Sequence, residues 1–150
     1  MEATVTELSL QDRVQWEQLY CGYAEFYKVP MNQQILDTVW SWIFDEQNKF
    51  YCLTAKNDAG EMLGIMHYRE MPSPLRGRLA GFLDDLYVLP ACRGTGVVDA
   101  LFAALATVSR EKNWPFVRWI TADDNYRGRG VYDKLAERTQ WITYQMATDE

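Results

Sequence analysis

Hydrophobic and polar positions alternate with different periods along the chain, and the changes of period predict its elements. Apolar side chains recur every three or four residues, as on one face of a helix, in segments 12–27, 35–44, 95–112 and 126–137. Shorter apolar runs with β-branched and aromatic residues predict strands at 4–10, 50–55, 62–68, 82–89, 116–121 and 141–146. The segment 71–81 holds prolines and glycines and is predicted to be a loop.

This order of elements predicts an α/β fold, a mixed sheet with helices on both faces. The segment 82–121 reads as strand, helix and strand, which is one βαβ crossover. No repeat, linker or low-complexity tract interrupts the chain. We therefore expect residues 1–150 to form a single domain, which suits a chain of 150 residues with 48% apolar content.

Composition narrows the classes of partner. The net charge is -6 and no basic run occurs, which argues against nucleic acid and favours a neutral or cationic small molecule. The chain has three cysteines and no CxxC pair, which argues against both a disulfide framework and a zinc site. We therefore expect no metal. No apolar stretch reaches the ~18 residues of a membrane span, and no secretory signal opens the chain. We expect a cytoplasmic protein that binds no membrane.

The segment from Leu83 to Asp99 is the most informative about chemistry. A strand ends at Pro90, the chain turns at 93–96, and an apolar-striped helix follows. Glycines at such a turn let the backbone approach an anion, and the helix N-terminus offers free N–H groups to a phosphate. A P-loop would need Gly-Lys-Ser/Thr here, and a dinucleotide fingerprint would need glycine where Asp99 stands. Both of those phosphate sites are therefore excluded.

Residues 93–98, reading RGTGVV, resemble instead the R-x-x-G-x-G/A signature of the GNAT superfamily of N-acetyltransferases. The strand 83–90, the pair Asn125 and Tyr132, and the segment 132–135 extend the resemblance over nearly the whole chain. It implies a GNAT-like, mostly antiparallel sheet and acetyl-CoA as co-substrate. The residues that the resemblance assigns to the coenzyme are Leu86, Tyr87, Val88, Arg93, Gly94, Thr95, Gly96, Val97, Val98, Asp99, Asn125, Tyr132 and Lys134. Val98, where the signature prefers Gly or Ala, and Gly128, where Ala is common, depart from the pattern.

Within that superfamily the segment is most similar to the spermidine/spermine (diamine) acetyltransferases. The similarity implies Asp84 as the base that deprotonates the amine, and Tyr132 as the acid that protonates the departing thiolate. Strand alternation predicts Asp84 on one face with Leu86 and Val88, and Asp85 on the other in a structural role. Asp84 paired with an arginine, and Tyr132 as a core aromatic, remain open alternatives. His67, the only histidine, is expected to be a packed strand residue.

The expected reaction is transfer of the acetyl group to a primary amine of a small molecule, namely a polyamine, an amino acid or an amine drug. Cys92 lacks the histidine and carboxylate pattern of a nucleophile, so direct attack in a ternary complex is favoured over an acyl-enzyme. A non-catalytic acyl-CoA sensor and a peptide or protein N-acetyltransferase stay open as alternatives. The resemblance also implies a homodimer, in which the strand near 140–146 pairs or swaps between subunits.

Overall fold

The computed structural model describes residues 3–149, which fall into two compact units, one ending at Trp119 and the other beginning at Ile120. Among the described residues, the first unit holds one sheet of five strands. They are β1 (Thr4–Glu7), β2 (Phe50–Lys56), β3 (Met62–Ser73), β4 (Arg78–Val88) and β5 (Val117–Arg118), adjacent in that order. Strands β1 to β4 are antiparallel and β5 runs parallel to β4. The expected mixed, mostly antiparallel sheet is confirmed.

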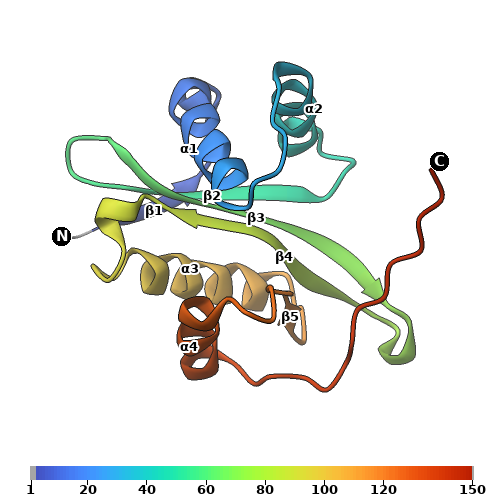
Figure 1. Ribbon diagram of the computed structural model, residues 1–150. Coiled ribbons are helices and arrows are strands. Elements are labelled where there is room, and N and C mark those ends of the chain that lie inside the picture. The colour runs from blue at the N-terminus through green and yellow to red at the C-terminus, as the bar shows by residue number, and fades with distance from the viewer. Residues whose placement is uncertain (1–2, 150) are drawn as a thin grey trace. The chain divides into compact units, whose positions relative to one another are not determined.

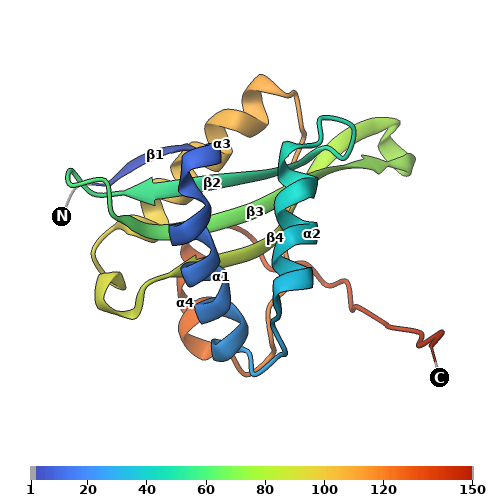
Figure 2. The same cartoon turned by 90° about the horizontal axis from the view of Figure 1, so that it is seen from above.

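Helices cover both faces of this sheet (Figure 1). Helices α1 (Arg13–Phe26) and α2 (Gln33–Phe44) lie side by side on one face, as Figure 2 also shows, and α3 (Val97–Glu111) lies on the other. Apolar residues that recur at helical spacing are buried on each side, Trp16 and Leu19 under α1, and Leu101 and Leu105 under α3. Short 3-10 turns precede α1 (Leu10–Asp12), join β3 to β4 (Pro74–Arg76) and follow β4 (Pro90–Cys92).

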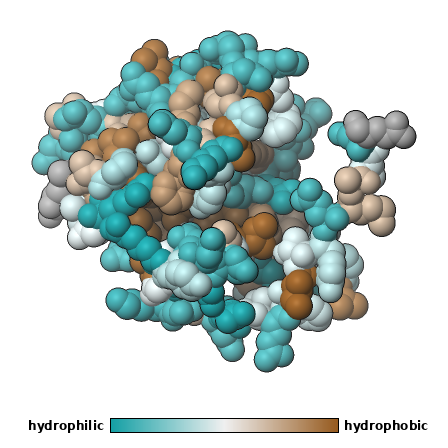
Figure 3. All heavy atoms as spheres, in the orientation of Figure 1, coloured by the Kyte–Doolittle hydropathy of each residue, from teal (hydrophilic) through white to brown (hydrophobic). Residues whose placement is uncertain are grey.

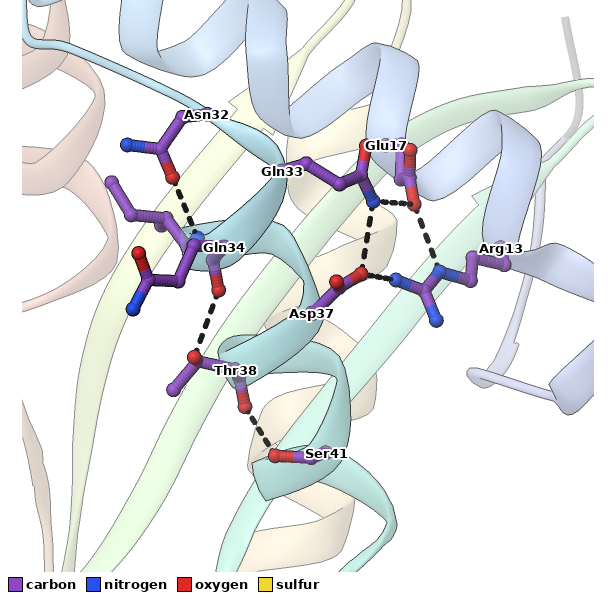
Figure 4. Close-up of polar contacts among 9 residues, drawn as sticks. Arg13, Glu17, Asn32, Gln33, Gln34, Asp37, Thr38 and Ser41 are labelled. Carbon is purple, nitrogen blue, oxygen red and sulfur yellow. Dashed lines mark hydrogen bonds and ion pairs between the residues drawn. The ribbon is translucent and has the colours of Figure 1, made fainter.

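A polar cluster joins α1 to α2 on their outer surface (Figure 4). Arg13 donates to Glu17 in its own helix at 2.8 Å and forms an ion pair with Asp37 of α2. Gln33 donates to Asp37 at 2.9 Å, so the carboxylate is shared between the two helices. Asn32 caps the start of α2, because its Oδ1 accepts the Ile35 N–H at 2.9 Å. The Arg13–Asp37 ion pair therefore links the two helices at the surface, whereas the Asn32 cap acts within α2.

The segment 71–81 is not a loop, and that prediction was wrong. Strands β3 and β4 continue through it and meet at a turn where Gly77 has a φ of 62°. Pro72 is tolerated because β2 ends its pairing with β3 at Arg69, so beyond that point β3 has β4 as its only paired neighbour among the described residues. Proline has no backbone N–H to donate, and at such an edge this loss costs little because no strand lies there to accept it.

The second unit contains α4 (Tyr126–Leu135) and an extended segment to residue 149. The predicted strand at 141–146 is absent from it, since an extended segment becomes a strand only where a partner supplies ladder hydrogen bonds. Its apolar side chains are exposed, among them Trp141 and Ile142. The strand predicted at 116–121 is likewise reduced to the two residues of β5.

Polar side chains cover most of the face seen in Figure 3, with apolar residues set among them. Over the described residues, no helix has the length and apolarity needed to cross a membrane.

Candidate active site

A bulge in β4 places two consecutive carboxylates on the same face of the sheet. In the strand register, His67 of β3 lies opposite Asp85 and Tyr68 lies opposite Leu83. Asp84 is therefore an extra residue in β4, with no residue of β3 opposite it. Side chains of neighbouring strand residues normally point to opposite faces, but an extra residue cancels one alternation. Asp84 and Asp85 therefore line one pocket together.

The predicted alternation in β4 was wrong for this reason. Leu86 and Val88 pack in the core beneath α3, not on the face that carries Asp84. Asp85, expected on the opposite face, lies beside Asp84. Two adjacent acidic residues interrupt an otherwise apolar strand here, but no local pattern in the sequence identifies the bulge.

The pocket lies between the paired helices and the sheet, entirely within the first unit. Aromatic and apolar side chains of Tyr20, Val39, Trp42 and Phe50 form part of its lining. Its charged lining is one guanidinium, from Arg69, and three carboxylates, from Glu70, Asp84 and Asp85. An excess of negative charge beside aromatic faces suits a cationic amine through both ion pairing and cation–π contact.

Asp85 accepts several hydrogen bonds. His67 Nδ1 lies 2.8 Å from Asp85 Oδ2, and the Tyr20 hydroxyl donates to the same oxygen at 3.0 Å. The Tyr23 hydroxyl also favours the charged form of this carboxylate. Burial raises the pKa of Asp85, but these donors lower it more, so the pKa is below its usual value and the carboxylate is ionised at neutral pH.

His67 is fully buried, as predicted, but the prediction missed its polar partners. Burial lowers the pKa of the imidazole, but Cys52 and Asp85 raise it more, so these effects together favour a pKa above the usual value. The hydrogen bond at the second ring nitrogen opposes that direction and fixes the protonation state. The indole Nε1 of buried Trp16 donates to His67 Nε2 at 2.9 Å. An indole N–H can only donate, so Nε2 carries a lone pair and the ring proton is on Nδ1. His67 is thus a neutral imidazole that donates to Asp85.

Asp84 has a different environment from its neighbour. Burial raises its pKa to about 6, an effect that Arg69 opposes and the charge of Asp85 reinforces. Arg69 Nε lies 3.3 Å from Asp84 Oδ2, with the arginine half exposed and stacked over Phe82. Asp84 is therefore paired with an arginine, which is the alternative that the sequence left open for it. It does not exclude a catalytic role, because a pKa near 6 leaves Asp84 ionised at neutral pH and able to accept a proton.

The glycine turn before α3 has the backbone that an anion site requires. Gly94 and Gly96 have φ values of 79° and 92°, in the left-handed region that only glycine adopts readily. Gly96 caps α3 without a side-chain hydrogen bond, so no side chain of the described residues caps the first N–H groups of this helix. The Thr95 hydroxyl donates to the Cys92 carbonyl and closes the turn.

The other predicted coenzyme residues of the first unit contribute differently. Arg93 Nε contacts the Val88 carbonyl at 3.4 Å, and its guanidinium lies over the Phe26 ring, so it ties the turn to the end of β4. Val97 is buried and Val98 packs against the core, which gives Val98 a structural reason to be apolar. Asp99 is exposed in the first turn of α3.

Leu86, Tyr87 and Val88 offer their backbone rather than their side chains. Within the described part of the chain, β5 pairs with β4 only at Gly81 and Phe82. The edge of β4 beyond Phe82 is therefore without a paired strand, which leaves its outward N–H and C=O groups for an extended ligand. The Tyr87 ring itself is buried in the core beneath α1 and α2.

In the second unit, Asn125 caps α4. Its Oδ1 accepts the Gly128 N–H at 3.3 Å and its Nδ2 donates to Thr121 at 2.9 Å. A Cβ at position 128 would lie 2.4 Å from Asn125 Nδ2, which explains why glycine stands there. Tyr132, partly buried, is two helical turns beyond Asn125, and Lys134 is exposed in the last turn. Their roles toward the coenzyme and the thiolate remain predictions.

No cluster of three or more metal-ligating His, Cys, Asp or Glu side chains occurs in the residues that the structure describes. The chemistry that this arrangement offers is anion binding at the turn, backbone pairing along β4, and proton transfer at Asp84.

Sequence and fold comparisons relate this chain to known proteins. Residues 15–136 match the sequence model of the Acetyltransferase (GNAT) family. The chain is 25% identical over 142 residues to the D-amino-acid N-acetyltransferase HPA3 of Saccharomyces cerevisiae, covering 94% of this chain and 88% of that protein.

Two solved structures share the fold over almost their whole length. A ribosomal-protein-alanine N-acetyltransferase from Brucella melitensis biovar Abortus 2308 aligns with a TM-score of 0.81 at 25% identity, covering 99% of this chain and 100% of that one. The structure of AAC(6')-Iy in complex with the bisubstrate analog CoA-S-monomethyl-acetylneamine aligns with a TM-score of 0.86 at 16% identity, with the same coverage of both chains.

Proposed function

We propose, from the premise that this chain belongs to the acetyltransferase (GNAT) family and is an acetyl-CoA-dependent acyltransferase, that it acetylates a primary amine of a small molecule. The observation that carries this proposal is the pocket in which Asp84 and Asp85 lie together beside aromatic side chains. A cationic amine is attracted there by the charges and meets a carboxylate whose pKa of about 6 suits a base at neutral pH.

The residues present fit acetyl-CoA. The positive-φ glycines and the uncapped N-terminus of α3 suit the pyrophosphate, and the open edge of β4 at 86–88 suits the extended pantetheine arm. When bound, acetyl-CoA supplies the thioester carbonyl that the amine attacks.

The proton balance assigns a task to each proposed residue. The ammonium gives one proton to Asp84, and the freed nitrogen lone pair forms the C–N bond as the C–S bond breaks. Nitrogen then loses its second proton to water, and the sulfur that leaves with the bonding electrons gains one from the Tyr132 hydroxyl, which water reloads. Asp84 returns its proton to water. No acyl-enzyme is needed, and Cys92 is buried.

Among polyamines, amino acids and amine drugs, the charges around Asp84 favour an amino acid. Arg69 pairs with Asp84 at 3.3 Å and is half exposed, so a zwitterion can meet both charges of the pocket, its ammonium at the two carboxylates and its carboxylate at Arg69. The name of the yeast relative, a D-amino-acid N-acetyltransferase, supports the same class.

The test is release of thiol from acetyl-CoA over a panel of amines. We choose phenylalanine, as both enantiomers, with phenethylamine as its matched analogue without a carboxylate, and spermidine as the polyamine. Phenylalanine should be preferred over phenethylamine, and Arg69→Gln should remove that preference while both amines still react. Equal rates for the pair in the unsubstituted enzyme would reject the amino acid class, whereas spermidine turnover alone would favour the diamine subgroup.

Binding of acetyl-CoA without thiol release for any amine would reject small-molecule acetylation and favour a non-catalytic sensor. Acetylated peptides found by mass spectrometry, with no small amine turned over, would instead favour a peptide or protein acceptor.

A further inference from the structure

A line of hydrogen bonds runs from the core to the pocket wall. It begins at Trp16, passes through His67 and ends at the carboxylate of Asp85. Trp16 and His67 are both fully buried, whereas the Asp85 side chain retains 18% exposure and lines the pocket. The line therefore has one end in the core and one end at the surface that an acceptor meets.

In this line Trp16 donates to His67, and His67 donates in turn to Asp85. The Trp16 indole holds the imidazole proton on Nδ1, and that proton points to Asp85 Oδ2. The Tyr20 hydroxyl donates to the same oxygen. A carboxylate that receives several hydrogen bonds keeps its charge even when it is largely buried.

No full positive charge compensates Asp85, because its imidazole partner is neutral. The arginine at the pocket pairs with Asp84 instead. A stabilised anion that faces a pocket and has only neutral donors behind it is a site for a cation from outside.

We propose that Asp85 is the fixed anion that binds the acceptor ammonium, and that His67 is a positioning residue that acts through it, while Asp84 exchanges the proton. This inference rests on the proposed acetylation of a small amine. The β4 bulge is what makes such a division possible, since it places both carboxylates in one pocket.

Each carboxylate is suited to one task by its surroundings. Asp85 faces His67, Tyr20 and Tyr23, which favour its charged form. Asp84 faces Arg69, Asp85 and His67, and it is also close to Tyr20. Two adjacent acids whose proton affinities are driven apart can serve as ion-pair partner and as base, respectively.

His67 itself is not the base. Its ring is inaccessible, one nitrogen donates to Asp85 and the other accepts from Trp16. A catalytic proton could reach it only through Asp85.

The first test is kinetic and uses Asp85→Asn, His67→Leu and His67→Asn. Asp85→Asn should raise KM for the amine by about tenfold to a hundredfold, with KM for acetyl-CoA unchanged. In the pH profile of kcat/KM, the fall on the acidic side (the acidic limb) should also move to lower pH. The reason is that the charge of Asp85 no longer raises the pKa of Asp84. His67→Leu should raise KM for the amine in the same way, and His67→Asn, whose side-chain amide can replace the Nδ1 donor, should recover part of the loss.

Ile65→Val is the matched control, since Ile65 is fully buried on the same strand beside the same helices but has no part in the line. It should leave both KM values and the acidic limb unchanged. The proposal is overturned if the folded Asp85→Asn variant has a KM for the amine within twofold of the unsubstituted enzyme and its kcat/KM falls at the same acidic pH. An unsubstituted enzyme that turns over no amine overturns the proposed function instead, and this inference with it.

The second test needs no substitution. His67 is the only histidine of the chain, so nitrogen NMR of histidine-labelled protein reports this ring alone. We expect a neutral ring protonated on Nδ1 between about pH 6 and pH 8. An imidazolium, or a proton on Nε2, would overturn the line of donors whether or not the variants fold.

Discussion

Gly22 of α1 lies so close to Tyr87 of β4 that a Cβ at position 22 would be 2.7 Å from the Tyr87 hydroxyl oxygen and 3.0 Å from the ring carbon that carries it. The glycine allows the helix to approach the strand segment whose backbone is proposed to bind pantetheine. A conformationally costly residue in the middle of a helix is thus required by the contact between helix and sheet.

Gly22→Ala should therefore destabilise the protein. Alanine would normally improve an exposed helix by about 1 kcal/mol, but the clash with a rigid ring should cost about 1–3 kcal/mol and outweigh it. Thermal or urea unfolding measures the change. Gly130→Ala is the control, because its new Cβ meets nothing within 4 Å. Equal or greater stability of Gly22→Ala than of the control would contradict the close contact.

Gly96→Ala tests the turn before α3. Its φ of 92° costs an alanine about 1–2 kcal/mol, although the added Cβ has open space. KM for acetyl-CoA should rise by roughly fivefold to thirtyfold as the turn relaxes to another conformation. Gly77→Ala is a matched control, with a φ of 62° and equally open space in the β3–β4 turn. The two variants should lose similar stability, and an equal rise in KM for both would argue against the coenzyme turn.

Asp84 should control the pH dependence of the reaction. Its pKa of about 6 predicts that kcat/KM falls as pH drops through that value, since protonated Asp84 cannot accept a proton. Asp84→Asn should lower kcat by about a hundredfold or more and abolish this limb. A pH profile of the variant that keeps both the limb and most of kcat would exclude Asp84 as the base.

The same raised pKa has a consequence for stability. Between pH 3.8, the ordinary value, and about 6, the folded state binds more protons at Asp84 than the unfolded state does, so stability falls as pH rises through this window. Asp84→Asn should remove this contribution, which urea unfolding at several pH values can detect. An unchanged slope against pH would mean that Asp84 is not desolvated in the folded protein.

Tyr132→Phe should lower kcat by about a hundredfold with little change in KM for the amine, because it removes the proposed proton donor and keeps the ring. Tyr126→Phe on the same helix is the control, since Tyr126 is 76% exposed. Full activity of Tyr132→Phe would leave Tyr132 with only a packing role.

Self-association is expected through the segment 140–146. Trp141 and Ile142 are 81% and 76% exposed, and a second copy that pairs with this segment would bury them. Sedimentation equilibrium should show a dimer that Trp141→Ser with Ile142→Ser shifts toward monomer. A monomer at all concentrations of the unsubstituted chain would reject the homodimer.

Local sequence predicted the elements whose causes are local. Helices α1 and α2 follow from the spacing of their apolar residues, and the start of α2 follows from Asn32. The predicted anion-binding turn follows from Gly94 and Gly96, because glycine adopts their positive φ values most readily. These features depend on residues within a few positions of one another.

Elements that depend on a distant partner were predicted less well. The strands within 71–81 were missed because they stabilise each other across a turn, despite a local composition typical of loops. The strand expected at 141–146 has the right composition but no partner among the described residues. A strand is defined by its neighbours, whereas a helix satisfies its own backbone.

By itself, the sequence determined the family, the glycine turn, the mixed fold and the identity of Asp84 as a candidate base. Tertiary structure decided that Asp85 stands beside Asp84 and that His67, 18 positions earlier in the chain, holds it. The reason is that strand register, including one extra residue in β4, is set by the packing of the whole sheet. No local pattern of side chains encodes which residues of two strands stand opposite each other.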